Sequence, residues 1–128
     1  MLSRSRGTLE TILVVDDNEA VLHVVAAALE SADFRVLVAD SPAAALRLAK
    51  KKDEKIDLLL SDVEMPDMSG PQLAERTRHT RPQTPVLLMS GYTAGALPSG
   101  PAASGDLPLI RKPFNAETLL QHLQDALT

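Results

Sequence analysis

Five short apolar runs recur along the chain, at residues 12–15, 34–39, 56–60, 86–89 and 107–110. Each is too short for a stable helix, and most are apolar at consecutive positions. Such runs are typical of strands buried on both faces of a parallel sheet. The pattern therefore predicts five strands, of which the one at 34–39 alternates most clearly between apolar and polar positions.

Segments with helical spacing separate these runs. From Asn18 to Ala32, apolar residues recur at intervals of three and four, which predicts an amphipathic helix. Ser41 before Pro42 is a typical helix start, and Ser69 with Gln72 three residues later fits a capping box. The predicted helices cover residues 18–32, 42–51, 71–79 and 115–127.

Alternation of strands and helices with right-handed crossovers predicts an α/β fold, a doubly wound five-stranded parallel sheet with helices on both faces. The expected strand order is 2-1-3-4-5, the flavodoxin-like order. Between Gly91 and Asp106 the sequence contains three glycines and two prolines. The fourth helix should therefore be short or irregular.

Composition limits the alternatives. The length of 128 residues predicts one domain over residues 11–128, with residues 1–10 as a flexible lead. A net charge of −4 without a dense basic cluster argues against nucleic acid as a partner, and Lys50 to Lys52 fit a solvated helix end. No apolar stretch approaches the roughly 20 residues that span a bilayer. We expect a cytoplasmic domain without membrane contact.

Four of the five predicted strands end in polar groups of related chemistry, namely Asp16, Asp17, Asp62, Ser90 and Lys112. Ligands of open α/β sheets bind outside the carboxyl ends of the strands, so these side chains should converge at one edge. Three carboxylates brought together repel one another unless a cation lies among them. Oxygen ligands alone favour Mg2+ over zinc.

A carboxylate nucleophile beside Mg2+, a lysine and a hydroxyl is suited to binding a phosphoryl group. The segments that carry these residues are LVVDD at 13–17, LLLSDVEMPDMSG at 58–70, PVLLMSG at 85–91 and RKPF at 111–114. With these spacings, the chain resembles a receiver domain of a two-component response regulator over residues 11–127.

The resemblance implies a role for each matching residue. Asp62 would accept a phosphoryl group from the phosphohistidine of a sensor histidine kinase or a histidine phosphotransfer protein. Asp17 would bind Mg2+ directly, Asp16 mainly through a water, and Glu64 through its backbone carbonyl. The remaining implied features are Lys112 pairing with the phosphoryl group, Ser90 moving to hydrogen-bond it, and a cis Lys112-Pro113 peptide.

The same resemblance implies a signalling switch that catalyses only its own phosphorylation and dephosphorylation, as a monomer or weak dimer. The segment GTLETILVVDD, the SGY at 90–92 and RKPF resemble receivers at the C-terminus of hybrid histidine kinases, which we favour over a stand-alone regulator.

Two features depart from the family pattern. Leu109 stands where most receivers have an aromatic residue, so we expect reordering of residues 93–106 to carry the switch. Tyr92, the only tyrosine, is a candidate partner contact or simply a packed or exposed ring.

Three other functions are compared with this one. An aspartyl phosphatase of the haloacid dehalogenase type needs a second aspartate where Glu64 stands. A nucleotide-binding module needs a glycine-rich loop after the first strand, and Asp16-Asp17-Asn18 contains no glycine. The third is a receiver-like docking module that is not phosphorylated, which the intact acidic triad disfavours.

Overall fold

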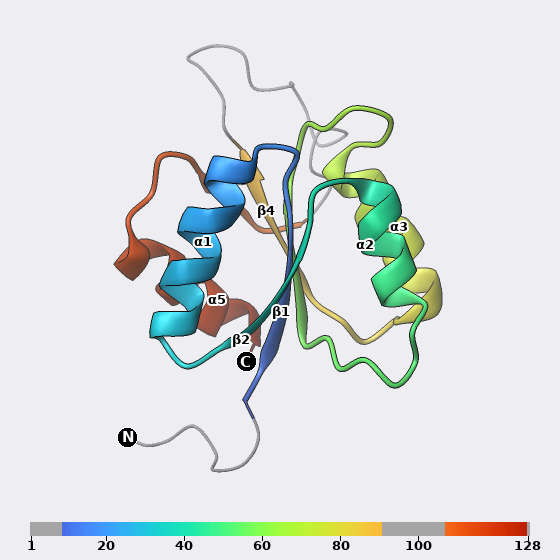
Figure 1. Ribbon diagram of the computed structural model, residues 1–128, viewed down its shortest axis with the longest axis horizontal. Coiled ribbons are helices and arrows are strands. Elements are labelled where there is room, and N and C mark those ends of the chain that lie inside the picture. The colour runs from blue at the N-terminus through green and yellow to red at the C-terminus, as the bar shows by residue number, and fades with distance from the viewer. Residues whose placement is uncertain (1–8, 91–106, 128) are drawn as a thin grey trace.

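The computed structural model describes residues 9–90 and 107–127 and contains a five-stranded parallel sheet in the order β2-β1-β3-β4-β5 (Figure 1). This confirms the predicted doubly wound, flavodoxin-like sheet. The strands are β1 (Thr11–Val15), β2 (Arg35–Ala39), β3 (Leu58–Asp62), β4 (Val86–Ser90) and β5 (Leu109–Arg111). The helices of the described part are α1 (Glu19–Ser31), α2 (Pro42–Ala49), α3 (Gly70–Thr80) and α5 (Ala116–Leu127).

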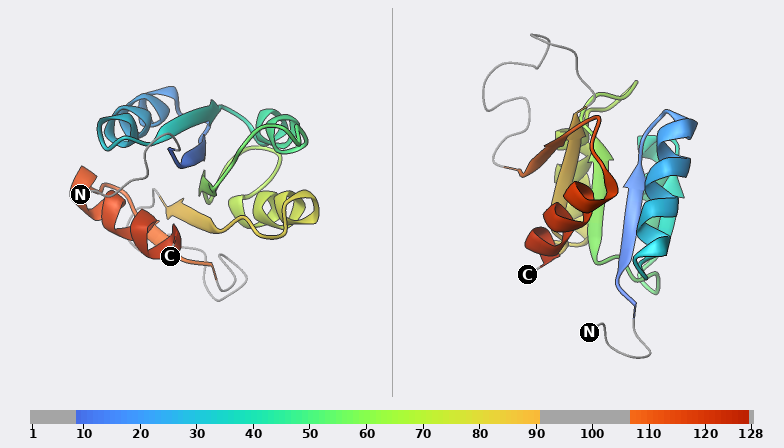
Figure 2. Two further views of the ribbon diagram at one scale, coloured as in Figure 1. Left: turned by 90° about the horizontal axis from the view of Figure 1, so that it is seen from below. Right: turned by 90° about the vertical axis from the view of Figure 1, so that its left-hand side faces the viewer.

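Helices cover both faces of the sheet, with α1 and α5 on one side and α2 and α3 on the other (Figures 1 and 2). Alternate side chains of β1 pack on opposite faces of the sheet. Ile12 and Val14 pack in the cluster under α1 and α5, whereas Leu13 and Val15 pack in the cluster under α2 and α3. Strands β1, β3 and β4 are buried at every position, as their continuous apolar runs predicted.

Side-chain caps define where the helices begin. Asn18 accepts hydrogen bonds from the backbone of the first turn of α1, and Ser41 does the same for α2. Ser69 and Gln72 form the predicted capping box of α3. Asn115 accepts from the Thr118 N–H at 2.7 Å and starts α5. Each cap satisfies amide groups that the helix itself leaves unpaired.

Three strands begin later than the sequence pattern predicts. Strand β3 begins at Leu58 rather than Ile56, because the intervening Asp57 N–H bonds to the Thr11 carbonyl at the start of β1. Phe34 donates its N–H to Leu29 at the end of α1, so β2 begins at Arg35. Pro108 has no N–H to donate, and β5 begins after it at Leu109. Leu109 itself is partly buried against the cluster under α2 and α3.

The end of α1 is closed by a residue with positive φ. Asp33, at φ 71°, follows the cap residue Ala32. Its N–H bonds to the carbonyl of Glu30, and the next N–H bonds to that of Leu29, both at 3.0 Å. This is the left-handed closure at which glycine is usually found.

Arg81, just after α3, ties the far ends of α2 and α3 together. Its guanidinium donates to three backbone carbonyls, those of Ala49 at 2.8 Å, Lys51 at 2.6 Å and Glu54 at 2.7 Å. One planar side chain therefore satisfies the carbonyls that the end of α2 and the following turn leave open.

Several predictions fall on residues outside the described ranges. These are the short or irregular fourth helix between Gly91 and Asp106, the reordering of residues 93–106, the role of Tyr92, and most of the flexible lead at 1–10. In the described part, no helix combines the length and apolar character needed to cross a membrane.

Candidate functional site

Strand register brings the predicted polar residues to one edge of the sheet. Val15 pairs with Ser61 in the β1–β3 ladder, so Asp16 and Asp62 follow at the same level. Ser90 is the last residue of β4 and pairs with Arg111 of β5, directly before Lys112. The convergence expected from sequence is therefore present for all four strand ends.

Asp16, Asp17 and Asp62 form a compact carboxylate group. One oxygen from each lies within 4.8 Å of those of the other two. Asp16 and Asp62 are buried, at 1% and 8% exposure, whereas Asp17 is exposed. The cluster is thus anchored in the protein on one side and open to solvent on the other.

Lys112 supplies a positive charge to this group. Its ammonium nitrogen lies 2.9 Å from Asp16 Oδ2 and 3.4 Å from Asp62 Oδ1. The backbone N–H of Lys112 donates to the Ser90 carbonyl at 2.8 Å, and the Lys112-Pro113 peptide is cis, as expected. Three carboxylates against one ammonium leave an excess of two negative charges when all are ionised.

Burial raises the pKa of Asp62 from 3.8 to about 6. Lys112 opposes the rise by its charge and hydrogen bond, while the negative charges of Asp16 and Asp17 add to it. Asp62 is therefore a carboxylate at the end of the middle strand whose charged form is disfavoured by burial and by two neighbouring carboxylates.

Asn18 holds the Asp16 side chain in place. Its N–H donates to Asp16 Oδ1 at 2.9 Å while its own side chain caps α1. Asp16 thus has one oxygen bonded to a backbone amide and the other to Lys112. From its sequence position Asn18 is predicted only as a helix start, although an asparagine directly after an acidic pair was the available signal.

Gly70 fixes the approach of α3 to the end of β3. A Cβ at this position would overlap the carbonyl oxygen of Asp62. The Gly70 N–H also donates to the Val63 carbonyl at 2.8 Å, and the Val63 N–H donates to that of Met89 at 2.8 Å. The loop from Val63 to Gly70 is therefore tied to β3 and β4 at its base.

Two further predicted residues lie beside this group. Ser90 is 4% exposed and stands at the end of β4. Glu64 is exposed two residues after Asp62, and its side chain is not part of the three-carboxylate group found in the described residues. The expectation for Glu64 concerned its backbone carbonyl, and this expectation stays a prediction.

The donor set fits a hard divalent cation. All three side chains offer carboxylate oxygens, which Mg2+ prefers, and the exposed side of the cluster leaves room for the waters that Mg2+ retains. Burial is the main cause of the raised pKa of Asp62, and the negative charges of Asp16 and Asp17 add to it. These residues therefore match the predicted magnesium site in chemistry.

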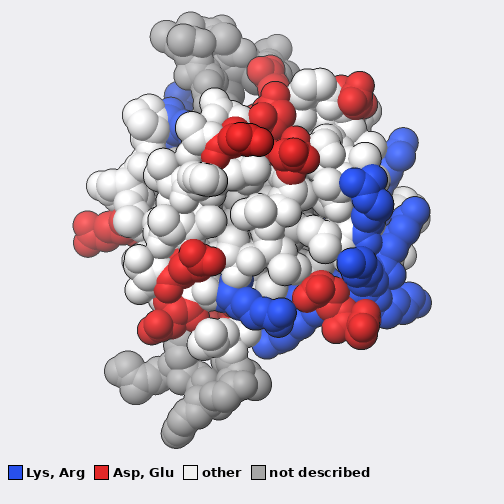
Figure 3. Space-filling model, viewed as in Figure 1, with Lys and Arg blue, Asp and Glu red and all other residues white. Residues whose placement is uncertain are grey.

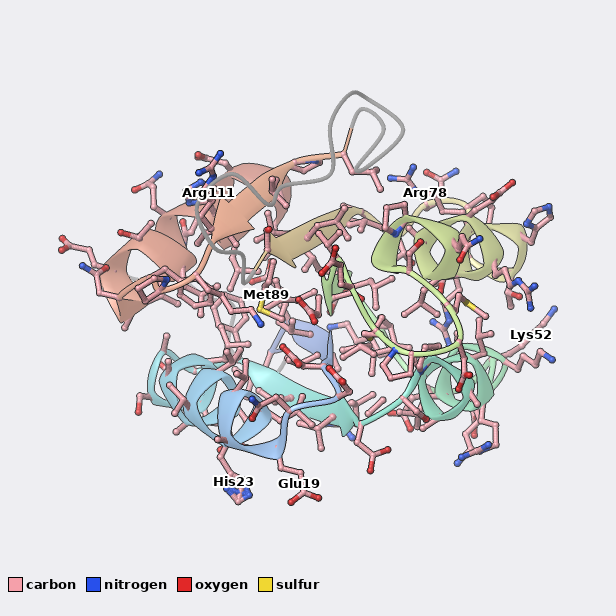
Figure 4. The ribbon with its side chains drawn as sticks, turned by 90° about the horizontal axis from the view of Figure 1, so that it is seen from above. Glu19, His23, Lys52, Arg78, Met89 and Arg111 are labelled. Atoms are coloured by element: carbon pink, nitrogen blue, oxygen red, sulfur yellow. The ribbon has the colours of Figure 1, made fainter. Side chains whose placement is uncertain are left out.

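Acidic and basic side chains occupy different parts of the surface. Acidic side chains gather at the upper edge of the face in Figure 3, whereas Lys and Arg gather toward the lower right, on the side of α2 and α3. Figure 4 looks down on the ends of the strands, with Met89 of β4 near the centre and oxygen atoms of side chains around it.

Comparison with known proteins establishes the family. The model of the response regulator receiver domain matches residues 12–124, which is most of the chain. The protein belongs to the response regulator receiver family of two-component systems, whose members act as signalling switches. The family resemblance drawn from the sequence is confirmed.

Relatives include both regulators and kinases. The chain is 33% identical to transcriptional regulatory protein GlrR of Escherichia coli and 32% identical to sensor kinase CckA of Brucella abortus, in each case over 91% of its length. It spans only 26% of GlrR and 12% of CckA. Among solved structures, a receiver domain from Clostridium thermocellum superposes with a TM-score of 0.81 at 28% identity, covering 93% of this chain and 94% of that one.

Proposed function

We propose that Asp62 accepts a phosphoryl group from a phosphohistidine in a Mg2+-dependent reaction. The observation that carries the proposal is the position of Asp62 at the end of β3, within 4.8 Å of Asp16 and Asp17 and 3.4 Å from Lys112. Membership of the receiver family supports the same assignment.

In the proposed step, an Asp62 carboxylate oxygen attacks phosphorus in line with the phosphorus–nitrogen bond of the donor. The new phosphorus–oxygen bond forms as the old bond breaks, and the donor imidazole, protonated by solvent on its other ring nitrogen, leaves as neutral imidazole. Lys112 neutralises charge on the transferred oxygens, and the Ser90 hydroxyl donates a hydrogen bond to one of them. Positioning and charge neutralisation supply the catalysis.

Asp17 would hold Mg2+ directly, with Asp62 and the Glu64 carbonyl, and Asp16 would act mainly through a bound water. When bound, the ion supplies positive charge to the phosphoryl oxygens and removes the repulsion among the carboxylates. Attack of water on the acyl phosphate later returns inorganic phosphate and free Asp62. The change in local charge would select between two surface states.

We propose a sensor histidine kinase or a histidine phosphotransfer protein as donor, with the domain acting in the cytoplasm as a monomer or weak dimer. The similarity to a sensor kinase supports the proposal that this domain comes from a hybrid kinase. The similarity to a transcriptional regulatory protein supports the alternative that it comes from a regulator.

The test is incubation with acetyl phosphate and Mg2+, followed by intact mass spectrometry. One base-labile phosphoryl group is expected on the wild type and none on Asp62→Asn. Asp67→Asn is the matched control, because Asp67 is an exposed carboxylate in the same loop and should leave labelling unchanged.

Two results would contradict the proposal. Labelling of Asp62→Asn at another residue would remove Asp62 from its role, and an unlabelled wild type would favour the docking module that is not phosphorylated. Rapid turnover of the donor by the wild type without accumulation of labelled protein would instead indicate a phosphatase.

A further inference from the structure

Strand β2 is an edge of the sheet and pairs only with β1 among the described strands. The Arg35 N–H and the Ala39 carbonyl both bond toward β1. Because backbone groups alternate along a strand, those of Val36 and Val38 point to the opposite, free edge. An edge of this kind is a template for another strand.

A groove of about 570 Å³ lies along this edge, between α1 and β2. Val38, which is 51% exposed, lies in it, so the groove presents apolar surface to solvent. Its lining combines residues of α1, of β2 and the following turn, and of the first turn of α2. They are Glu19, Leu22, His23, Ala26, Glu30, Val36, Val38, Ala39, Asp40 and Ala44.

Charge in the groove is concentrated at its two ends. Glu19 begins α1 near Asp40, which follows β2, and Glu30 lies one residue before the other end of α1. Small or apolar side chains, including Ala26 and Val38, lie between these ends. Figure 3 views this face, where uncharged surface separates acidic groups above from acidic groups below, and Figure 4 shows Glu19 and His23 on the outer side of α1.

The groove has the length of a short strand. Eleven residue steps of helix from Glu19 to Glu30 span about 17 Å, and the five residues of β2 extend over about the same distance. An added strand of five residues would place three alternate side chains in the groove. The outer two would meet the carboxylates, and the middle one would meet Val38.

We propose that β2 binds an extended segment of a partner protein as a sixth strand. The segment has a basic residue at each end and an apolar residue in the middle, with the three separated by single residues. Backbone hydrogen bonds to Val36 and Val38 provide affinity, and the acidic ends with their apolar centre select the sequence. The proposal stands apart from phosphoryl transfer at Asp62.

Charge favours this occupant over a second copy of the chain. Antiparallel pairing of β2 with itself would bring the Asp40 end of one copy toward the Glu30 end of the other, which adds repulsion between two chains of net charge −4. Arg35 does not neutralise the groove, because it alternates to the other face of the sheet, where it pairs with Glu54 at 3.8 Å.

The experiment uses the full chain labelled with ¹⁵N and the peptide acetyl-Lys-Thr-Val-Thr-Lys-amide. Titration should give saturable amide shifts centred on Val36 and Val38. Glu30→Lys should weaken binding about fivefold, as expected for one lost ion pair and a new repulsion. Glu75→Lys, an exposed charge reversal on α3, is the matched control and should bind like the wild type.

Backbone methylation of the peptide tests the added strand itself. Methyl groups on one alternating set of amides should abolish binding, whereas methyl groups on the other set should not, because only one set faces β2. Equal effects of both sets, equal binding of acetyl-Glu-Thr-Val-Thr-Glu-amide, or no shift at β2 would overturn the proposal.

A second copy as occupant would appear as concentration-dependent shifts at β2 without peptide, which would also overturn it. Labelling of the same samples with acetyl phosphate tests the role of Asp62 independently, so failure of one proposal can be distinguished from failure of the other.

Discussion

The ammonium group of Lys112 lies closer to Asp16, at 2.9 Å, than to Asp62, at 3.4 Å. The buried Asp16 carboxylate therefore has the shorter ion pair, and Asp62 keeps a pKa of about 6 despite the nearby lysine. Of the two buried carboxylates, Asp62 has the longer contact with the ammonium group of Lys112. Two predictions depend on this arrangement.

Replacing Asp62 with Asn should stabilise the metal-free protein at neutral pH. The folded state holds the Asp62 proton up to about pH 6, whereas the unfolded chain releases it near 3.8, so the wild type loses stability as pH rises between these values. The gain from Asp62→Asn should grow over the same interval to at most about 3 kcal/mol. Urea denaturation from pH 3.5 to 8 measures it, with Asp67→Asn as the exposed control. A gain that is independent of pH would contradict the raised pKa.

Mg2+ should raise the melting temperature of the wild type, because an ion that binds only the folded state stabilises it by mass action. Asp17→Asn should lose most of this rise with little change in the metal-free melting temperature, since Asp17 is exposed. Asp16→Asn should also lower the metal-free value, because Asp16 is buried and bonded to Asn18 and Lys112. Thermal-shift titration with MgCl2 separates the two. Full Mg2+ responses in both variants would exclude the metal site.

Gly70→Ala should distort the backbone that positions Asp62, although Gly70 itself has no side chain in the site. The new methyl group overlaps the Asp62 carbonyl, so either α3 or the end of β3 must shift. Such overpacking typically costs about 1–3 kcal/mol, and labelling by acetyl phosphate should slow. Pro71→Ala, at the next position of the same turn, is the control. Wild-type stability and labelling of Gly70→Ala would show that α3 adapts freely.

Asp33→Gly should stabilise the fold by about 1 kcal/mol, because glycine adopts the left-handed closure of α1 without the penalty of a Cβ. Asp33→Ala keeps the Cβ at φ 71° and should give no gain. Thermal denaturation of the two variants compares them directly. An equal gain from both would point to the lost charge of Asp33 rather than to its backbone.

Much of this architecture was predictable because the decisive signals are local. Val15 and Leu60 end apolar runs that only a buried strand explains, and the acids that follow them must share an edge once the strands are parallel. Caps such as Ser41 and Ser69 are also read within three residues of the helix they begin.

The remaining features depend on contacts between segments distant in sequence. Nothing near Gly70 reveals that a side chain there would meet the Asp62 carbonyl, and the distances from Lys112 to Asp16 and Asp62 depend on how β5 approaches β1 and β3. Phe34 illustrates a local conflict, because it suits a strand but its N–H is used to close α1.

Arg81 connects the C-terminal ends of α2 and α3 by hydrogen bonds, at the end of the molecule opposite Asp62. Its guanidinium bonds to Ala49 at the end of α2 and to Lys51 and Glu54 in the following turn, so a shift of α2 relative to the end of α3 would disturb charge-assisted bonds. We therefore expect α2 and α3 to move together, as one rigid body, in any conformational change. Spectroscopic probes attached to either one would report the same displacement.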